Sequence, residues 1–230
     1  MINIDRFLNQ IIQGDCLEVM RDIPDKSVDF VLTDPPYLCE INGGAGMAKT
    51  WNSRKTFFDM IENFSEHAQE MYRVLKDNSH CIIFTNSKSL QSSINQFTEV
   101  FRFIDLLTMV KSNAYPIGGY YLRNTEFALL LTKGFRRVND ESQKNIFYSE
   151  PVKNDIHPTV KPLSVIEKMI VQSSQKGDII FDPFLGSGTT AVAAHNTGRF
   201  FIGIEKEQKY VEIARQRLEQ AQTQQSLFTS

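Results

Sequence analysis

Short apolar segments alternate with helical patterns along most of this chain. The clearest apolar segments are 28–33, Val-Asp-Phe-Val-Leu-Thr, and 200–204, Phe-Phe-Ile-Gly-Ile. Other segments, such as 189–196 and 210–218, repeat apolar residues every three or four positions. Strands that alternate with helices usually form a parallel sheet with helices on both faces. The sequence therefore predicts a doubly wound α/β fold.

Seven strands and four helices are expected. The strands are predicted at 11–12, 28–33, 81–84, 104–110, 127–131, 179–181 and 200–204, and the helices at 57–75, 163–171, 189–196 and 210–218. Two glycine-bearing segments, 38–56 and 113–121, interrupt the pattern and are predicted to be loops. Residues 133–158 have no clean period, and the polar tail after Gln220 is expected to fray.

The composition limits both the size of the fold and the way it can bind partners. With 230 residues, of which 41% are hydrophobic, the chain can bury one full core, so 1–230 is expected to form a single domain. The 25 Lys and Arg residues against 27 Asp and Glu residues give a net charge of −2. Any contact with nucleic acid must therefore come from a local basic patch.

The three cysteines, Cys16, Cys39 and Cys81, are widely spaced and include no Cys-x-x-Cys pair. This pattern favours neither a disulfide framework nor a structural zinc site, and no metal is expected. No apolar run approaches the roughly 20 residues that a membrane helix needs. The sequence predicts a reduced, cytoplasmic protein that does not insert into a membrane.

A rigid acidic motif, Asp34-Pro35-Pro36-Tyr37, follows directly on the strand predicted at 28–33. Open α/β sheets bind their ligands at the carboxyl ends of strands. The two prolines fix the backbone, so that the Pro35 carbonyl is held beside the Asp34 carboxylate. Two such acceptors suit the two N–H groups of a planar amine, with the Tyr37 ring stacked on its face. The alternative is an ordinary turn, because Asp-Pro and Pro-Pro are common turn formers.

A glycine-bearing turn follows the strand predicted at 179–181. The turn, 182–188, reads Asp-Pro-Phe-Leu-Gly-Ser-Gly and leads into a helix that begins near Thr189. Glycines permit positive φ angles and close approach of a ligand to the backbone, and the first N–H groups of the helix can bind an anion. A P-loop would require Gly-Lys-Ser/Thr, whereas Thr189 follows Gly188 directly, so nucleotide hydrolysis is not expected.

Glu205 ends the next strand, about 20 residues beyond the glycine turn, which is the spacing at which a carboxylate binds a ribose in such units. The alternative is a solvated acid that opens the following helix. Together, the glycine turn and Glu205 indicate an adenosine-type cofactor.

These motifs resemble those of the S-adenosylmethionine-dependent DNA amino-methyltransferases, which form N6-methyladenine or N4-methylcytosine. Asp34-Pro35-Pro36-Tyr37 resembles their catalytic motif, 182–188 their cofactor loop, and Glu205 their ribose-binding acid. Two further segments are similar: 14–17, Gly-Asp-Cys-Leu, to the adenine-ring contact, and 157–162, His-Pro-Thr-Val-Lys-Pro, to the segment that closes over the methionine end. The catalytic motif precedes the cofactor loop, which is the permuted order of the beta group.

The resemblance, which covers about 11–218, implies a circularly permuted class I methyltransferase sheet, Rossmann-like, seven-stranded and mostly parallel, with the last strand antiparallel. It implies site-specific transfer of a methyl group from S-adenosyl-L-methionine to N6 of a flipped-out adenine in double-stranded DNA. Asp34, Pro35, Pro36 and Tyr37 are the implied catalytic residues. The implied cofactor-binding residues are Asp15, Cys16, His157, Thr159, Lys161, Asp182, Phe184, Gly186, Ser187, Gly188, Thr189 and Glu205. For His157 and Lys161, a plain helix start after Pro158 is an equal alternative.

Two other functions stay open. Cytosine N4 shares the geometry and the cofactor, although Asp34 favours adenine because many relatives that methylate cytosine N4 carry Ser there. A catalytically silent module that binds DNA or cofactor is disfavoured by the intact Asp34, Tyr37 and Glu205.

DNA recognition is less sharply marked in the sequence. We expect a small target-recognition segment at 134–156, aided by the catalytic-side loop 38–56, and phosphate contacts from Lys133, Arg136 and Arg137. A homodimer and a companion restriction nuclease are left open.

Overall fold

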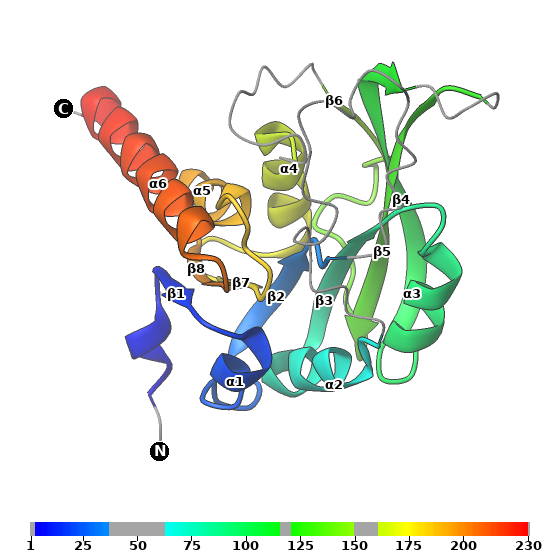
Figure 1. The fold of residues 1–230 in the computed structure, drawn as a ribbon, viewed down its shortest axis with the longest axis horizontal. Coiled ribbons are helices and arrows are strands. Elements are labelled where there is room, and N and C mark those ends of the chain that lie inside the picture. The colour runs from blue at the N-terminus through cyan, green and yellow to red at the C-terminus, as the bar shows by residue number, and fades with distance from the viewer. Residues whose placement is uncertain (1–2, 37–62, 116–120, 150–160, 230) are drawn as a thin grey trace, which may run out of the picture.

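The computed structural model describes residues 3–36, 63–115, 121–149 and 161–229. A sheet of eight strands runs through these residues in the order β1-β8-β7-β2-β3-β5-β4-β6 (Figure 1). The strands are β1 (Gln10–Gln13), β2 (Val28–Thr33), β3 (Leu75–Thr85), β4 (Arg102–Tyr115), β5 (Arg123–Lys133), β6 (Ile146–Ser149), β7 (Ile179–Asp182) and β8 (Phe200–Glu205). The helices are a short 3-10 helix, η1 (Ile4–Phe7), and α1 (Cys16–Met20), α2 (Ser65–Val74), α3 (Leu90–Phe97), α4 (Leu163–Ser173), α5 (Thr189–Asn196) and α6 (Gln208–Thr229). The doubly wound α/β class is confirmed.

Strands from both ends of the chain lie side by side in one parallel half of the sheet. β1 pairs with β8, with Ile11 opposite Gly203, and β7 pairs with β2, with Phe181 opposite Val31. β1, β8, β7, β2 and β3 all run in the same direction. The N-terminal strand therefore continues a sheet formed by the C-terminal ones, as the permuted order of the motifs predicts.

The other half of the sheet corrects two expectations. β5 runs antiparallel to both β3 and β4, so the antiparallel strand is an internal one and not the last in the chain. β6 adds an eighth strand, parallel to β4, with Thr108 opposite Ile146. The sequence pattern hides β6 because this strand is short and its exposed positions carry Ile146 and Tyr148, so that polar and apolar residues do not alternate along it.

Helices cover both faces of the sheet (Figure 1). α4, α5 and α6 pack over a core that includes Phe30 and Leu32 of β2, whereas α1, α2 and α3 pack over Val28 and Val31. Because β2 is buried on both faces, most of its residues are apolar and the segment reads as a continuous apolar run. α5 buries residues 189–194, and its small side chains let it lie close to the sheet.

The helices differ from the predicted ones mainly at their ends. α4 and α5 begin where predicted, whereas α2 begins at Ser65, and 57–62 lies outside the described residues. α6 continues to Thr229, so the expectation of a frayed tail after Gln220 is wrong; the Gln and Ala residues there favour a helix. The sequence pattern indicates neither α1, which has five residues, nor the largely polar α3. Within the described ranges, no helix is long and apolar enough to cross a membrane.

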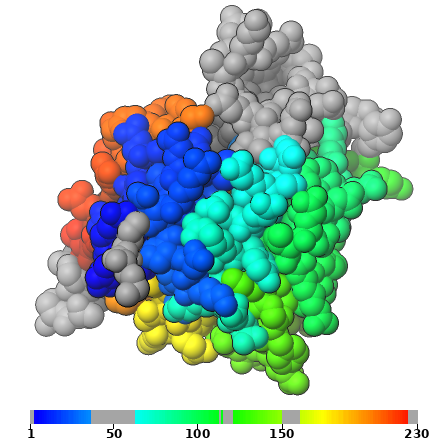
Figure 2. All heavy atoms as spheres, turned by 90° about the horizontal axis from the view of Figure 1, so that it is seen from below, coloured from blue at the N-terminus to red at the C-terminus, as the bar shows by residue number. Residues whose placement is uncertain are grey.

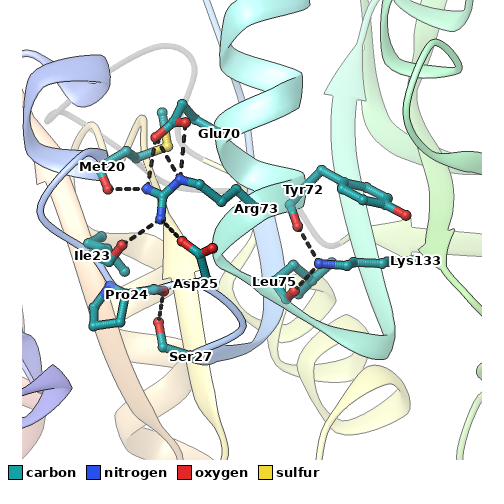
Figure 3. A network of polar contacts seen from close by, with 10 residues as sticks. All are labelled: Met20, Ile23, Pro24, Asp25, Ser27, Glu70, Tyr72, Arg73, Leu75 and Lys133. Carbon is teal, nitrogen blue, oxygen red and sulfur yellow. Dashed lines mark hydrogen bonds and ion pairs between the residues drawn. The ribbon is translucent and has the colours of Figure 1, made fainter. Parts of the chain in front are cut away.

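Arg73 of α2 fixes the connection between α1 and β2 (Figure 3). Its guanidinium donates to the carbonyl oxygens of Met20, at 2.6 Å, and Ile23, at 2.8 Å, and pairs with Glu70 and Asp25. Figure 2 shows this side of the molecule, where the blue N-terminal region and the cyan region of α2 form one continuous surface. These contacts support the start of β2, the strand that ends just before Asp34, the first residue of the predicted catalytic motif.

Candidate active site

Three acidic residues meet at one edge of the sheet. Asp34 follows β2, Asp182 ends β7 and Glu205 ends β8. These strands are parallel neighbours, so their carboxyl ends share one edge, which is where open α/β sheets bind ligands. The end of β1 joins this edge through Gly14, whose N–H donates to the Glu205 carbonyl oxygen at 3.1 Å. The structure thus brings together the three acids that the sequence singles out.

The glycine turn after β7 takes the left-handed backbone conformation at two positions. Gly186 has φ +55° and Gly188 has φ +85°. A Cβ at Gly188 would lie 2.7 Å from the Ala214 Cβ of α6, so only glycine lets the turn pack there. A Cβ at Gly186 would meet no atom within 4 Å, so the backbone of the turn is open at this point. This combination suits a ligand that approaches the turn closely.

Glu205 lies directly beside that open position. Its Oε2 accepts the Gly186 N–H at 2.8 Å, and its Oε1 accepts the Glu207 N–H at 2.8 Å. Burial raises the pKa of Glu205, although both amides stabilise the carboxylate. Each carboxylate oxygen can accept a second hydrogen bond. Glu205 is therefore placed to bind the paired hydroxyls of a ribose while it holds the turn.

Asp182 shapes the same turn from within. It is 4% exposed, and its Oδ1 accepts from the Thr33 hydroxyl at 2.6 Å and the Phe184 N–H at 3.0 Å. Burial raises the pKa of Asp182 to about 6, against the hydrogen bonds from Thr190, Thr33 and the Phe184 amide, which lower it. The nearby Asp34 carboxylate also raises it. Through these two bonds, Asp182 connects the glycine turn to β2, the strand that precedes the predicted catalytic motif.

Arg217 of α6 donates hydrogen bonds to the end of the glycine turn, at Ser187 and Thr189. It donates to the Ser187 carbonyl oxygen at 2.6 Å, the Ser187 hydroxyl at 2.8 Å and the Thr189 hydroxyl at 3.1 Å. Ser187 and Thr189 therefore serve the turn in this structure as partners of Arg217. The helical period of α6 gives no sign of this role, which depends on the packing of α6 beside α5.

Lys161 lies at the catalytic motif. Its ammonium donates to Oδ2 of Asp34 and lies 3.4 Å from Oε2 of Glu126, a residue of β5. It also lies 4.9 Å from the centre of the Phe84 ring. The second oxygen of Asp34, Oδ1, is buried and has no hydrogen-bond partner in the described part of the chain. Because a buried acceptor without a donor is costly, this oxygen is suited to an N–H group from a substrate.

The remaining predicted residues fall into two groups. Tyr37, His157, Thr159 and the loop 38–56 lie outside the described residues. Asp15 accepts the Leu17 N–H at 3.0 Å and so caps α1. Cys16 is buried, and this burial, helped by Asp15, raises the pKa of its thiol to about 12.

Lys133 does not lie near the catalytic motif. It ends β5 opposite Ser79, near the start of β3, whereas Thr33, which precedes Asp34, lies opposite Ile83, near the end of β3. The Lys133 side chain is 6% exposed. Its ammonium donates to the carbonyl oxygens of Tyr72 and Leu75, at 2.7 Å each (Figure 3). Contact of Lys133 with DNA phosphates is therefore unsupported.

Arg136 and Arg137 follow Lys133 at the same distant edge. The Arg136 carbonyl oxygen lies 3.1 Å from Nε2 of His80, and the Arg137 guanidinium pairs with Glu141 at 2.8 Å. Both side chains lie away from the carboxyl edge of the sheet because β5 runs antiparallel and delivers its last residues to the opposite edge. Arg136 and Arg137 therefore do not lie beside Asp34, and their contact with DNA phosphates stays a prediction.

Comparison with known proteins agrees with this geometry. A family model for N6 and N4 methyltransferases, described as DNA methylase, matches residues 28–216. The type II methyltransferase M.HinfI of Haemophilus influenzae is 29% identical, over 94% of this chain and 70% of its own length. The type II methyltransferase M2.DpnII of Streptococcus pneumoniae is 30% identical, over 91% of this chain and 89% of its own length.

Solved structures show the same fold. The M1.HpyAVI–SAM complex has a TM-score of 0.70 and 29% identity, over 91% of this chain and 99% of that one. PvuII DNA methyltransferase, which is cytosine-N4-specific, has a TM-score of 0.71 with 18% identity, over 90% of this chain and 84% of that one, a likeness in fold alone. The open backbone at Gly186 beside the Glu205 carboxylate fits the same cofactor. The chain belongs to the S-adenosylmethionine-dependent DNA amino-methyltransferases of the N6-adenine/N4-cytosine family.

Proposed function

We propose that this protein transfers a methyl group from S-adenosylmethionine to N6 of adenine at a specific site in double-stranded DNA. The observation that carries the proposal is the Asp34 carboxylate, which presents one buried oxygen without a partner in the described part of the chain while Lys161 holds the other. The cofactor supplies an electrophilic methyl group on a sulfonium. The protein must therefore supply the orientation of the amine.

Asp34 and the Pro35 carbonyl are proposed to accept the two N–H groups of the target amine. An exocyclic amine is a poor nucleophile because its lone pair is delocalised into the ring. Two acceptors on its hydrogens draw it toward tetrahedral geometry and stabilise the positive charge that develops on nitrogen during transfer. Tyr37 is proposed to stack on the base. A base paired within a duplex cannot reach the end of β2, so the target must be flipped out.

The described residues that we propose to bind the cofactor lie at the carboxyl ends of β1, β7 and β8. Glu205 binds the ribose hydroxyls, the backbone at Gly186 and Gly188 approaches the cofactor, and Asp15 and Cys16 lie where β1 ends beside Glu205. Asp182 and Phe184 hold the turn in its shape. His157 and Thr159 remain proposed contacts to the methionine end.

We propose adenine and not cytosine as the target base because residue 34 is an aspartate. The fold does not choose, since a cytosine-N4-specific enzyme shares it. An aspartate at the start of the catalytic motif favours adenine, because many relatives that methylate cytosine N4 carry Ser there.

The DNA is proposed to bind over the carboxyl edge. β4 and β5 extend past the last β3 pair, Thr85 with Phe127, and meet again where Tyr115 lies opposite Arg123. Beside Arg123, Tyr121 is 97% exposed and Leu122 is 62% exposed. This end of β4 and β5 offers a basic and two apolar side chains on the same side of the sheet as Asp34. The described part of the segment 134–156 ends with β6, which runs parallel to β4 toward this edge.

Nucleoside mass spectrometry tests the proposal. DNA from a methylation-deficient host that expresses the chain is expected to contain N6-methyladenine, and DNA from the same host with Asp34→Ala is expected to contain far less. N4-methylcytosine instead would establish the second candidate. Absence of both modified bases, with the protein present and folded, would favour a silent binding module.

A further inference from the structure

We infer that Glu126 and Lys111 act through Lys161 as positioning residues for Asp34. The four side chains form a row of alternating charges that holds one oxygen of Asp34 and leaves the other for the target amine. The inference rests on the proposed function, in which Asp34 accepts an N–H group of the base. It assigns Lys161 to the catalytic aspartate and not to the methionine end of the cofactor.

The row is built from four separate parts of the chain. Lys111 of β4 pairs with Oε1 of Glu126 on β5, and Oε2 of Glu126 lies 3.4 Å from the Lys161 ammonium. Lys161 stands just before α4 and donates to Oδ2 of Asp34 at the end of β2. Strand register explains the first pair, because Glu126 lies opposite Met109 and Lys111 is two residues further along on the same face.

The row is partly removed from water. The exposed fractions of the side chains are 8% for Lys161, 21% for Glu126, 28% for Lys111 and 29% for Asp34. Burial opposes the ionisation of Glu126, but the charges of Lys161 and Lys111 outweigh it and lower the pKa of Glu126. Two positive and two negative charges thus alternate with no net charge. Removal of one member would leave a poorly solvated charge unbalanced, so the row is sensitive to single substitutions.

The arrangement gives each member a distinct effect on Asp34. Lys161 holds Oδ2 of the carboxylate, so that Oδ1 is the oxygen that stays without a partner in the described part of the chain. It also stabilises the negative charge of Asp34. Glu126 shares the same ammonium and adds a negative charge nearby, so it keeps Lys161 in place and partly offsets its effect. Loss of the Lys161 charge and loss of the Glu126 charge should therefore have opposite electrostatic effects at this end of the row.

A single-turnover assay separates this role from cofactor binding. Enzyme in excess, methyl-labelled S-adenosylmethionine and DNA from a methylation-deficient host give the rate of transfer, and calorimetry gives the affinity for the cofactor. Lys161→Met is expected to slow transfer by about 10- to 100-fold, the cost of a misplaced reacting group, with cofactor affinity unchanged. Lys161→Arg, which keeps the charge, is expected to recover part of the rate. Lys168→Met, on the exposed face of α4, is the matched control and is expected to match the wild type.

The pH dependence of the transfer rate supplies a readout that a purely structural role would not move. In Lys161→Met, the acid limb of the profile is expected to shift to higher pH, because the variant removes the positive charge that pairs with the Asp34 carboxylate. In Glu126→Gln, it is expected to shift to lower pH. Both variants retain Lys111, which pairs with Glu126, and Asp182, whose carboxylate lies near that of Asp34. If Lys161→Met does not fold, Glu126→Gln still tests the direction of the shift, and Lys161→Arg, which keeps the charge, is expected to leave the acid limb in place.

Two kinds of failure can be told apart. A wild-type chain that transfers label to neither base overturns the proposed function and, with it, this inference. An active wild type combined with a Lys161→Met variant that loses cofactor affinity but keeps its rate at saturating cofactor overturns this inference alone and returns Lys161 to the methionine end. Acid limbs that coincide in wild type, Lys161→Met and Glu126→Gln overturn it as well.

Discussion

The Glu205 carboxylate accepts the backbone N–H of Gly186, with 2.8 Å between N and Oε2. The bond joins the end of β8 to the open position of the glycine turn that follows β7. One side chain thereby serves two purposes, because the carboxylate that is placed to bind the cofactor ribose also fixes the loop that the cofactor must approach. A substitution at Glu205 should affect both.

Glu205→Ala is expected to weaken the binding of S-adenosylmethionine by about tenfold or more, because charge-assisted hydrogen bonds are each worth roughly 1.5–3 kcal/mol. Glu205→Gln keeps one acceptor oxygen and should lie between this variant and the wild type. Glu207→Ala keeps the backbone N–H that donates to Glu205 and serves as the control. Isothermal calorimetry measures all four proteins. An unchanged affinity in Glu205→Ala would remove Glu205 from the site.

The proposed chemistry depends most on Asp34. Asp34→Ala, which lacks any acceptor, should lose at least about 10²-fold in rate, comparable to the removal of one preorganised hydrogen bond at a transition state. Asp34→Asn keeps an acceptor oxygen and should retain weak activity. Cofactor affinity should change little in either variant. Equal and complete loss in both would show that the negative charge itself is needed, and full activity in Asp34→Ala would refute the assignment of the catalytic site.

The sequence predicts well where the glycine turn and the acids at the strand ends lie, because these signals are local. β2 and β8 are buried strands that read as apolar runs, and parallel strands must bring their carboxyl ends to one edge. The position of an acid at a strand end is then enough to place Asp34 and Glu205 together. The turn at 182–188 is marked by glycines at the two positions with positive φ.

The DNA side could not be predicted in the same way, because it depends on pairing between distant segments. The direction of β5 decides that Lys133 reaches the carbonyl oxygens of Tyr72 and Leu75 while Glu126, at its other end, reaches Lys161. No local pattern separates a lysine that binds carbonyl oxygens from one that binds phosphate. The three basic residues that the sequence suggests for phosphate contacts therefore lie at the edge of the sheet opposite Asp34.

Base flipping should be visible by fluorescence. A 2-aminopurine at the target position is expected to brighten when the protein binds, because the probe leaves the base stack. A mismatch at that position should bind more tightly, since the cost of unstacking, a few kcal/mol, is partly met in advance. No change in fluorescence, with binding confirmed by an independent method, would count against extrusion of the base.

Arg123 is expected to contact DNA phosphates, unlike Arg137. Arg123 lies beyond the carboxyl end of β3, on the side of Asp34, whereas Arg137 pairs with Glu141 near the opposite edge. Arg123→Gln should weaken binding to all sequences alike and lower the slope of log affinity against log salt by about one. Arg137→Gln should leave both unchanged. If the site preference of Arg123→Gln relaxes while its slope holds, Arg123 reads bases.

Asp182 should make the stability of the protein depend on pH in a defined window. Burial raises its pKa from 3.8 to about 6 in the folded state, so the folded protein binds more protons than the unfolded chain between these values. The contribution of this group to the free energy of unfolding therefore falls as the pH rises from about 4 to about 6, by roughly 3 kcal/mol at most, since one pKa unit corresponds to about 1.4 kcal/mol.

Asp182→Asn isolates this contribution. The amide oxygen can still accept from Thr33 and the Phe184 N–H, but the group no longer ionises. Near pH 4 the variant and the wild type should differ least, and above about pH 6 the variant should gain relative to the wild type by an amount of that order. Other titrating groups, such as His80 and Glu205, are present in both proteins and cancel in the difference. Urea unfolding at a series of pH values measures it, and a difference that stays constant from pH 4 to pH 8 would show that Asp182 is ionised throughout.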